Sequence, residues 1–116
     1  MNTGTEFWTK LDELVSQSEI VIDRPKGSGH PRRAEFKMPM DYGYLEGTTG
    51  GDGAGIDLWR GSKEGISVDG VICTVDLYKR DAEVKILISC TEEEKQIAYE
   101  THNKSSQAGI LVKRPT

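Results

Sequence analysis

Two alternating stretches joined by a short polar segment read Gly70-Val-Ile-Cys-Thr-Val-Asp76-Leu-Tyr-Lys-Arg-Asp81-Ala-Glu-Val-Lys-Ile-Leu-Ile88. In the first stretch every second residue over 71–77 is apolar, whereas Thr74 and Asp76 fall on the opposite face. Residues 82–88 alternate in the same manner, which places Asp81, Glu83 and Lys85 together on the other face. The pattern predicts two strands joined by a solvated turn.

Two helices are predicted outside this pair of strands. Thr3 and Glu6 have the spacing of a capping box, and residues 3–16 carry an apolar face that includes Phe7 and Leu11. Thr91 begins a second capping box and predicts a helix over residues 92–103. The glutamates that follow it suit the positive end of a helix dipole, which we favour over a metal site there.

Shorter strands fill the rest of the chain. They are predicted over residues 19–23, 35–45 with a break at Pro39, 56–60 and 109–113, with loops over residues 24–31 and 47–55. A chain of 116 residues suits one domain, spanning residues 1–116. We therefore expect a mainly β fold with two helices: a small β-barrel with one helix before it and one inserted near its end.

Composition narrows the possible partners and the location. A net charge of −4 and a pI near 5.2 argue against capture of long nucleic acids, which requires many Lys and Arg side chains. No window is apolar enough to span a membrane and the first residues do not resemble a signal peptide, so we expect a cytoplasmic protein without membrane contact. Cys73 and Cys90 are expected to be buried free thiols.

A glycine-rich segment is the most informative for function. It reads Asp41-Tyr-Gly-Tyr-Leu-Glu-Gly-Thr-Thr-Gly-Gly-Asp52-Gly-Ala-Gly-Ile-Asp57-Leu-Trp59. The segment resembles the signature of the soluble inorganic pyrophosphatases, in which Y-G-Y/F-I-x-x-T runs without a gap into D-G-D-P-x-D and a strand. The spacing from Tyr42 through Asp52 to Asp57 matches that signature without insertion. Outside this context, Asp52-Gly53 would be an ordinary turn.

Two further matches support the resemblance. Asp76 and Asp81 lie five positions apart after a Gly-Val-Ile strand, as two aspartates of the family do. More weakly, Asp23 on a strand and Arg32 nine residues later resemble a glutamate and a lysine of the family. The resemblance covers roughly residues 20–88.

The resemblance implies an OB-like β-barrel that hydrolyses pyrophosphate, or a related phosphoanhydride, with Mg²⁺ or Mn²⁺. Such hard cations prefer carboxylate oxygens and lower the pKa of bound water, which then attacks phosphorus. It implies catalytic roles for Asp52, Asp57 and Tyr42, and phosphate contacts from Arg32, Tyr42 and Lys85. The metal ligands it implies are Asp52, Asp57, Asp76, Asp81 and Asp23.

Several family features are missing. Ala54 replaces the middle aspartate of D-G-D-P-x-D, and Lys85 matches the family lysine only with a shift in position, while Glu83 stands at the unshifted position. The family's arginine hairpin has no clear counterpart, although His30 or Arg33 can stand in. A C-terminal Tyr-Lys phosphate-binding pair is absent, which leaves Lys104, Lys113 and Arg114 unassigned.

We therefore expect a metal-dependent diphosphatase that forms a homo-oligomer and takes a small phosphorylated substrate. The principal alternative is a non-catalytic relative that binds metal and phosphate as a regulatory or interaction module. Residues 53–58 also touch the calcium-binding nonapeptide pattern, but in a single copy. An oligonucleotide-binding barrel is disfavoured by the low pI.

Overall fold

A computed structural model describes residues 4–116 of the chain. Within them lie two helices and eight strands. Their order is α1 (Thr5–Ser16), β1 (Ile20–Arg24), β2 (Gly29–His30), β3 (Arg33–Lys37), β4 (Asp41–Leu45), β5 (Ile56–Arg60), β6 (Val68–Asp76), β7 (Asp81–Ile88), α2 (Glu92–Thr101) and β8 (Gln107–Lys113). The mainly β fold with two helices is confirmed.

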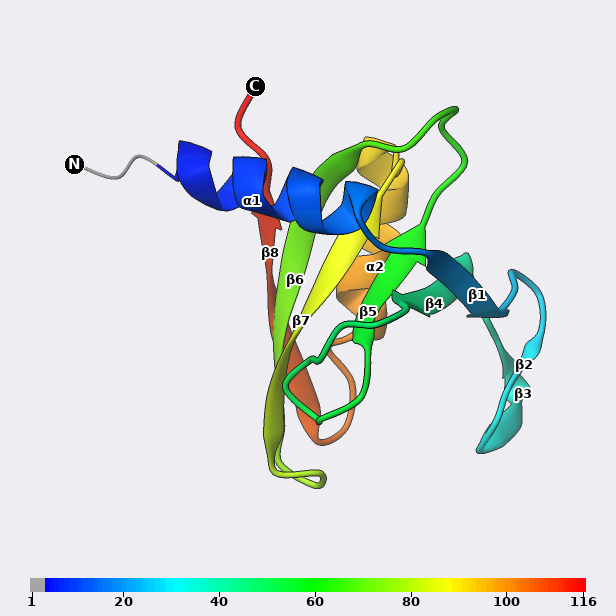
Figure 1. Cartoon of the computed structure of the whole chain (residues 1–116). Coiled ribbons are helices and arrows are strands. Elements are labelled where there is room, and N and C mark those ends of the chain that lie inside the picture. Colours follow the sequence, from blue (N-terminus) through cyan, green and yellow to red (C-terminus); the bar gives the residue numbers. More distant parts are fainter. Residues whose placement is uncertain (1–3) are drawn as a thin grey trace.

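Six of the strands form one open sheet. Their order is β1-β4-β5-β7-β6-β8, and β2 and β3 form a separate ribbon. Strands β5 and β7 run parallel, whereas the other neighbours in the sheet run antiparallel. Strands β1 and β8 are the two edges, so the expected closure into a barrel is not present. Figure 1 shows the twist that turns β1 and β4 across the direction of β6 and β8.

The hairpin of β6 and β7 forms the centre of the sheet. Its register runs from Gly70 opposite Leu87 to Asp76 opposite Asp81, and the turn is closed by Arg80 with a φ of 58°. Strand β8 pairs along the other side of β6, from Gly70 to Asp76. The predicted alternation is confirmed, because neighbouring residues of each strand pack on opposite faces.

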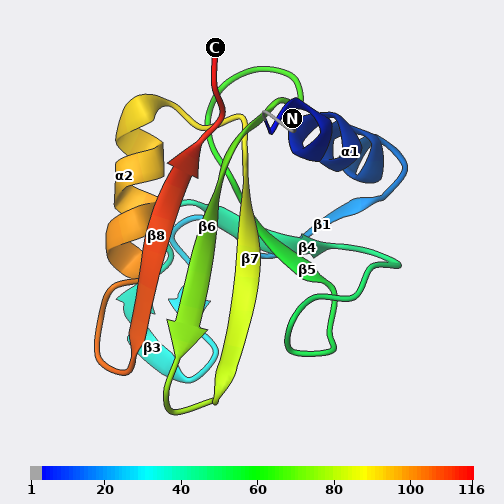
Figure 2. The same cartoon turned by 90° about the vertical axis from the view of Figure 1, so that its left-hand side faces the viewer.

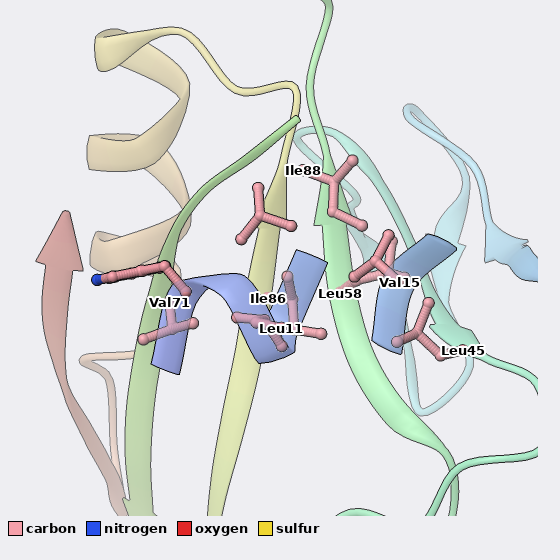
Figure 3. Packing of buried hydrophobic residues seen from close by; sticks show 9 residues of the cluster. Leu11, Val15, Leu45, Leu58, Val71, Ile86 and Ile88 are labelled. Atoms are coloured by element: carbon pink, nitrogen blue, oxygen red, sulfur yellow. The ribbon is translucent and has the colours of Figure 1, made fainter. Parts of the chain in front are cut away.

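A helix covers part of each face of the sheet (Figure 2). The α1 side buries a first apolar core, in which Leu11 and Val15 point toward Leu58 and Ile86 of the sheet (Figure 3). The α2 side buries a second core around Trp59. This second core consists of Met38, Met40, Tyr42, Trp59, Ile72, Leu87, Cys90 and Ala98.

Helix α1 packs mostly with the predicted face, since Leu11, Leu14 and Val15 contact the core as expected, but Trp8 takes the place expected for Phe7. Trp8, Leu11 and Val15 are its buried residues, whereas Phe7 is 48% exposed. The spacing of three and four residues between the buried positions is that of a helix stripe, so the stripe starts one residue later than expected. The helix follows Gly4, which has a φ of 89°. The predicted cap, Thr3, lies outside the described residues.

Helix α2 begins as predicted. Thr91 accepts a hydrogen bond from the backbone of Glu94, and the Glu94 carboxylate accepts one from the backbone of Thr91. The glutamates therefore start the helix and do not form a separate cluster. Among residues 4–116, neither helix is long and apolar enough to cross a membrane. Cys73 and Cys90 are free thiols; Cys90 is buried and Cys73 half-buried.

Strand β8 is an edge whose first half is covered by the preceding loop. The backbone N–H of Gln107 donates to the Lys104 carbonyl (3.0 Å). The N–H of Gly109 donates to Asn103 Oδ1 (3.1 Å). These donors are therefore already bonded on the side away from β6.

Candidate metal and phosphate site

Lys85 lies at the centre of a buried polar cluster on the α2 side of the sheet. Its Nζ donates to Tyr42 Oη (3.0 Å), Asp57 Oδ2 (2.8 Å) and Glu83 Oε2 (2.9 Å). The side chain is only 4% exposed. Alternation along β7 gives Lys85 this orientation, because Leu87, two residues later, packs in the α2-side core. The sequence prediction that Glu83 and Lys85 share a face is thus confirmed.

Tyr42 and Asp57 reach this cluster from the neighbouring strands β4 and β5. Tyr42 Oη donates to Asp57 Oδ2 (2.7 Å). The Tyr42 ring packs against Trp59, with 4.6 Å between ring centroids. Burial raises the pKa of Tyr42, and this effect outweighs the opposing influence of Lys85. The phenol therefore stays protonated and acts as a hydrogen-bond donor at neutral pH.

Three carboxylates meet beside Lys85. One oxygen from each of Asp52, Asp57 and Glu83 lies within 4.8 Å of the others. Glu83 is buried, Asp57 is half-buried and Asp52 is exposed. An all-oxygen donor set of this kind suits Mg²⁺ or Mn²⁺, which also retain waters and substrate oxygens as ligands. With Lys85 included, the ionised cluster carries a net charge of −2, which a single divalent cation would neutralise.

For both Glu83 and Lys85, burial and the neighbouring groups shift the pKa in opposite directions. Burial raises the pKa of Glu83, and Lys85 opposes that effect. Burial disfavours the Lys85 ammonium as well, but contacts with Tyr42 and Asp57 outweigh it and raise the pKa of Lys85. Lys85 therefore remains charged, and its charge stabilises the neighbouring carboxylates.

The glycine-rich loop brings Asp52 to the cluster. The backbone N–H of Ala54 donates to Asp52 Oδ1 (2.9 Å), which lowers the pKa of Asp52. Gly51 lies so close to β7 that a Cβ atom on it would collide with the Ala82 carbonyl oxygen. A glycine is therefore required at position 51 for the loop to approach β7 and to hold Asp52 near Glu83.

A cavity of about 320 Å³ adjoins the cluster, and both Tyr42 and Lys85 line it. The walls are rich in basic side chains although the whole chain is acidic. Burial lowers the pKa of His30, and the positive charges of nearby basic residues lower it further. The arginines and lysines that line the cavity are Arg24, Arg32, Lys79 and Lys85, and the histidines His30 and His102 line it as well. We call this space the basic cavity.

Arg24 is a cavity residue that the sequence analysis missed. A β-bulge between Ile22 and Arg24 shifts the register of β1 and pairs Arg24 with Tyr42. The guanidinium carbon lies 5.4 Å from the centre of the Tyr42 ring. Asp23, the residue that the family match selects, is exposed and is not in the carboxylate cluster. No local sequence pattern around Ile22 predicts this bulge.

Asp76 and Asp81 also lie outside the carboxylate cluster. Asp76 closes the hairpin turn, because it accepts hydrogen bonds from the backbone of Tyr78 (2.9 Å) and from Ser106 Oγ (2.9 Å). The backbone N–H of Lys79 also bonds to Asp76 and is the main cause of its lowered pKa. Asp76 still lines the basic cavity. Its carboxylate is largely committed to the turn.

Two buried oxygens near the cluster have no hydrogen-bond partner among residues 4–116. They are Thr74 Oγ1 and Asp81 Oδ1. Thr74 lies opposite Glu83 in the ladder of β6 and β7, and Asp81 shares the face of Glu83 two residues away. Buried oxygens without partners are costly unless something else satisfies them.

The site residues expected from the sequence divide into those that come together and those that lie outside the cluster, which are Asp23, Asp76 and Asp81. Asp52, Asp57, Tyr42 and Lys85 come together, and Arg32 lies close by in the basic cavity. Glu83 joins them as an additional carboxylate, which the sequence indicated only through its place on the Lys85 face and its match to the position of a family lysine. Of the proposed stand-ins for the missing arginine, His30 lines the cavity, whereas Arg33 is not among the lining residues.

Comparison of this chain with protein-family models, with curated proteins and with solved structures finds no match.

Proposed function

We propose that the chain binds Mg²⁺ or Mn²⁺ through Asp52, Asp57 and Glu83 and hydrolyses pyrophosphate or a related phosphoanhydride. One observation carries the proposal: the carboxylate cluster adjoins the basic cavity, and Lys85 and Tyr42 line the cavity while they bond to carboxylates of the cluster. A phosphoanhydride needs cations around its oxygens and a metal at the reacting phosphorus. The two sites together supply both requirements.

Each residue has a role that follows from its chemistry. Arg24, Arg32 and Lys85 would neutralise phosphate oxygens, and Tyr42 would donate a hydrogen bond from its protonated phenol. The metal, when bound, would polarise phosphate oxygens and acidify a water molecule. Asp52 is exposed and ionised at neutral pH, so it is the carboxylate best suited to accept the proton of the attacking water.

The proposal includes kinship with the soluble inorganic pyrophosphatases. It rests on the sequence signature from Tyr42 to Asp57 and on the convergence of these two residues with Asp52. In this view the twisted six-stranded sheet is an open form of the family's OB-like barrel.

Phosphate release from pyrophosphate tests the activity, with nucleoside triphosphates assayed in parallel. We expect turnover that requires Mg²⁺ or Mn²⁺ and stops on chelation. Asp57→Asn should lower the rate by roughly 10–100-fold or more, because it weakens a metal ligand and a contact of Lys85. Asp23→Asn is the matched control and should leave the rate unchanged, because Asp23 is exposed and outside the cluster.

A non-catalytic module that binds metal and phosphate is the second candidate. Ala54 favours it, because the family carries a carboxylate at that position and Ala54 offers none. The contact of Lys85 with two of the three carboxylates also favours it, because an ammonium competes with a cation. Calorimetric binding of Mg²⁺ and pyrophosphate without phosphate release would select this candidate. Absence of both binding and turnover would reject both candidates.

A further inference from the structure

The basic cavity offers contacts that a pyrophosphate ion cannot use. Its volume of about 320 Å³ lies at the lower end of the range for cavities that hold organic ligands of drug size. Phe36, Met38 and Trp59 line it together with the basic residues. A pyrophosphate ion consists of phosphorus and oxygen and has no apolar surface to place against these walls. The apolar part of the lining therefore indicates a ligand that carries an organic group.

Asp76 brings a negative charge into this basic cavity. It is only 9% exposed, and its Oδ1 accepts three hydrogen bonds, from Tyr78, Lys79 and Ser106. The bond from Lys79 contributes most to the lowered pKa of Asp76, so the carboxylate is ionised at neutral pH. Its Oδ2 has no hydrogen-bond partner among residues 4–116. A free carboxylate oxygen repels phosphate and accepts from a hydroxyl or amino group instead.

Gln107 presents a hydrogen-bond donor next to Asp76. The two residues lie opposite each other in the pairing of β6 with β8, and both line the cavity. Trp59 Nε1 donates to His102 Nε2 (2.9 Å), so the ring proton of His102 lies on Nδ1 and donates to Gln107 Oε1 (3.0 Å). This fixes the orientation of the Gln107 amide. Its Nε2 group finds no acceptor within the described part of the chain, so a donor stands beside the free acceptor of Asp76.

This pair of groups fits a hydroxyl better than a phosphate oxygen. A hydroxyl donates to the Asp76 carboxylate and accepts from the Gln107 amide, whereas an ionised phosphate oxygen only accepts. A carboxylate that binds a ribose hydroxyl is common in proteins that bind dinucleotides. The hydroxyls of a sugar are therefore suitable partners for this side of the cavity.

Phe36 supplies an aromatic ring near the pair. Lys104 Nζ lies 5.8 Å from the centre of the Phe36 ring, and the Lys104 carbonyl accepts a hydrogen bond from the backbone of Gln107 (3.0 Å). An aromatic side chain stacks with any nucleic-acid base, because every base has a π-face. Sugar hydroxyls and a base are the two parts of a nucleoside.

We propose that the substrate is a nucleoside 5′-diphosphate, an inference that rests on the proposed function and narrows its phosphoanhydride. The diphosphate would lie at the Lys85 end of the cavity, and the nucleoside between Phe36 and the pair of Asp76 and Gln107. Hydrolysis would form a bond from the water oxygen to the terminal phosphorus. The bond from that phosphorus to the bridging oxygen would break, and its electron pair would leave on the nucleoside monophosphate. The proton of the water would pass to Asp52.

Calorimetry with ADP and with pyrophosphate, both in the presence of chelator, tests the nucleoside site. The proposed hydrolysis requires a metal, so binding is measured without turnover. The two ligands share a diphosphate group, and a difference in affinity therefore reports the nucleoside. We expect ADP to bind at least about tenfold more tightly, which is within the range for stacking of one base. Phosphate release from both ligands with Mg²⁺ is measured separately.

Phe36→Leu removes the ring and keeps an apolar side chain. The affinity for ADP should fall roughly 5–100-fold, and the preference for ADP over pyrophosphate should be lost. Phe7→Leu is the matched control, because Phe7 is 48% exposed and lines a different cavity. That variant should keep the affinities of the unmodified chain.

Asp76→Asn should change the two affinities in opposite directions. Asparagine keeps a carbonyl oxygen for the turn but loses the negative charge and the free acceptor. The affinity for ADP should fall roughly tenfold, because a hydroxyl loses its charged acceptor. The affinity for pyrophosphate should rise, because a negative charge leaves the cavity. An equal fall in both affinities would indicate a role in structure alone and would count against the nucleoside site.

The outcomes distinguish the nucleoside site from the hydrolysis proposed above. Equal affinities for ADP and pyrophosphate, or an ADP affinity that Phe36→Leu leaves unchanged, would overturn the nucleoside site and leave hydrolysis of pyrophosphate standing. ADP binding that depends on Phe36, without phosphate release, would support the site and reject hydrolysis. Absence of ADP binding both in chelator and with Mg²⁺ would overturn the nucleoside site.

Discussion

Lys85 combines two roles that are usually separate, a structural ion pair and a wall of the basic cavity. Lys85→Met keeps most of the apolar stem and removes the charge. Because Asp57 and Glu83 then lack their cation, we expect the free energy of unfolding to fall by about 3–5 kcal/mol in metal-free buffer. Urea unfolding measures this loss, and Mg²⁺ should restore part of it by replacing the missing charge.

Lys95→Met is the matched control for this substitution. Lys95 is also buried, but its partner Glu92 is 68% exposed at the surface. A pair of this kind contributes about 0–1 kcal/mol. Equal losses for the two variants would mean that the carboxylates of the cluster do not depend on Lys85.

His102 predicts a stability that depends on pH. Trp59 Nε1 donates to His102 Nε2 (2.9 Å), so the ring proton lies on Nδ1 and donates to Gln107 Oε1 (3.0 Å). Burial lowers the pKa of His102 to about 4. In the unfolded chain it is about 6.5. The unfolded state therefore binds more protons between these values, and stability is lost as pH falls from about 6.5 to about 4.

Comparison of the unmodified chain with the His102→Gln variant isolates the contribution of His102 to the pH dependence of stability. Between pH 7 and pH 4.5 the unmodified chain should lose about 2–3 kcal/mol more unfolding free energy than the variant. Urea unfolding at both pH values measures the difference. Parallel pH profiles for the two chains would show that His102 does not titrate in this range.

At the scale of elements, the position of the glycine-rich loop depends on Gly51. Gly51→Ala should push the loop away from β7 and remove Asp52 from the cluster, because the added methyl group meets the Ala82 carbonyl. We expect Mg²⁺ affinity, measured by calorimetry, to fall roughly 10-fold or more. Gly50→Ala is the control, since its Cβ would lie 3.4 Å from the nearest atom. Equal affinity in both variants would contradict this role of Gly51.

Long periodic elements were predictable from sequence, whereas short or irregular ones were not. The hairpin of β6 and β7 and the start of α2 have strong local signals in alternation and in the capping box at Thr91. The β2–β3 ribbon was assigned partly to a loop, because Gly29 and Pro31 argue against strands and the ribbon is held by pairing between segments. The sequence analysis placed Phe7 on the buried face of α1, where Trp8 lies instead, because the same helix spacing can begin at either of two neighbouring residues.

At the scale of the whole molecule, spatial convergence could be predicted only in part. The match from Tyr42 to Asp57 selected residues that the structure does bring together. The basic cavity collects Arg24, Arg32 and Lys79 from three separate segments, and no local pattern links them. The net charge of −4 conceals this local excess of positive charge. The expectation of a barrel was not confirmed, because alternation specifies strands but does not specify which edges pair.

Asn103 bonds to the backbone of β8 at the edge of the sheet and so limits aggregation through that edge. An open sheet edge recruits further strands, one after another, and seeds filaments. Along the first half of β8, the N–H groups of Gln107 and Gly109 are already bonded to the preceding loop, so an incoming strand finds no free donors there. This half of the β8 edge is therefore a poor template for the addition of further strands.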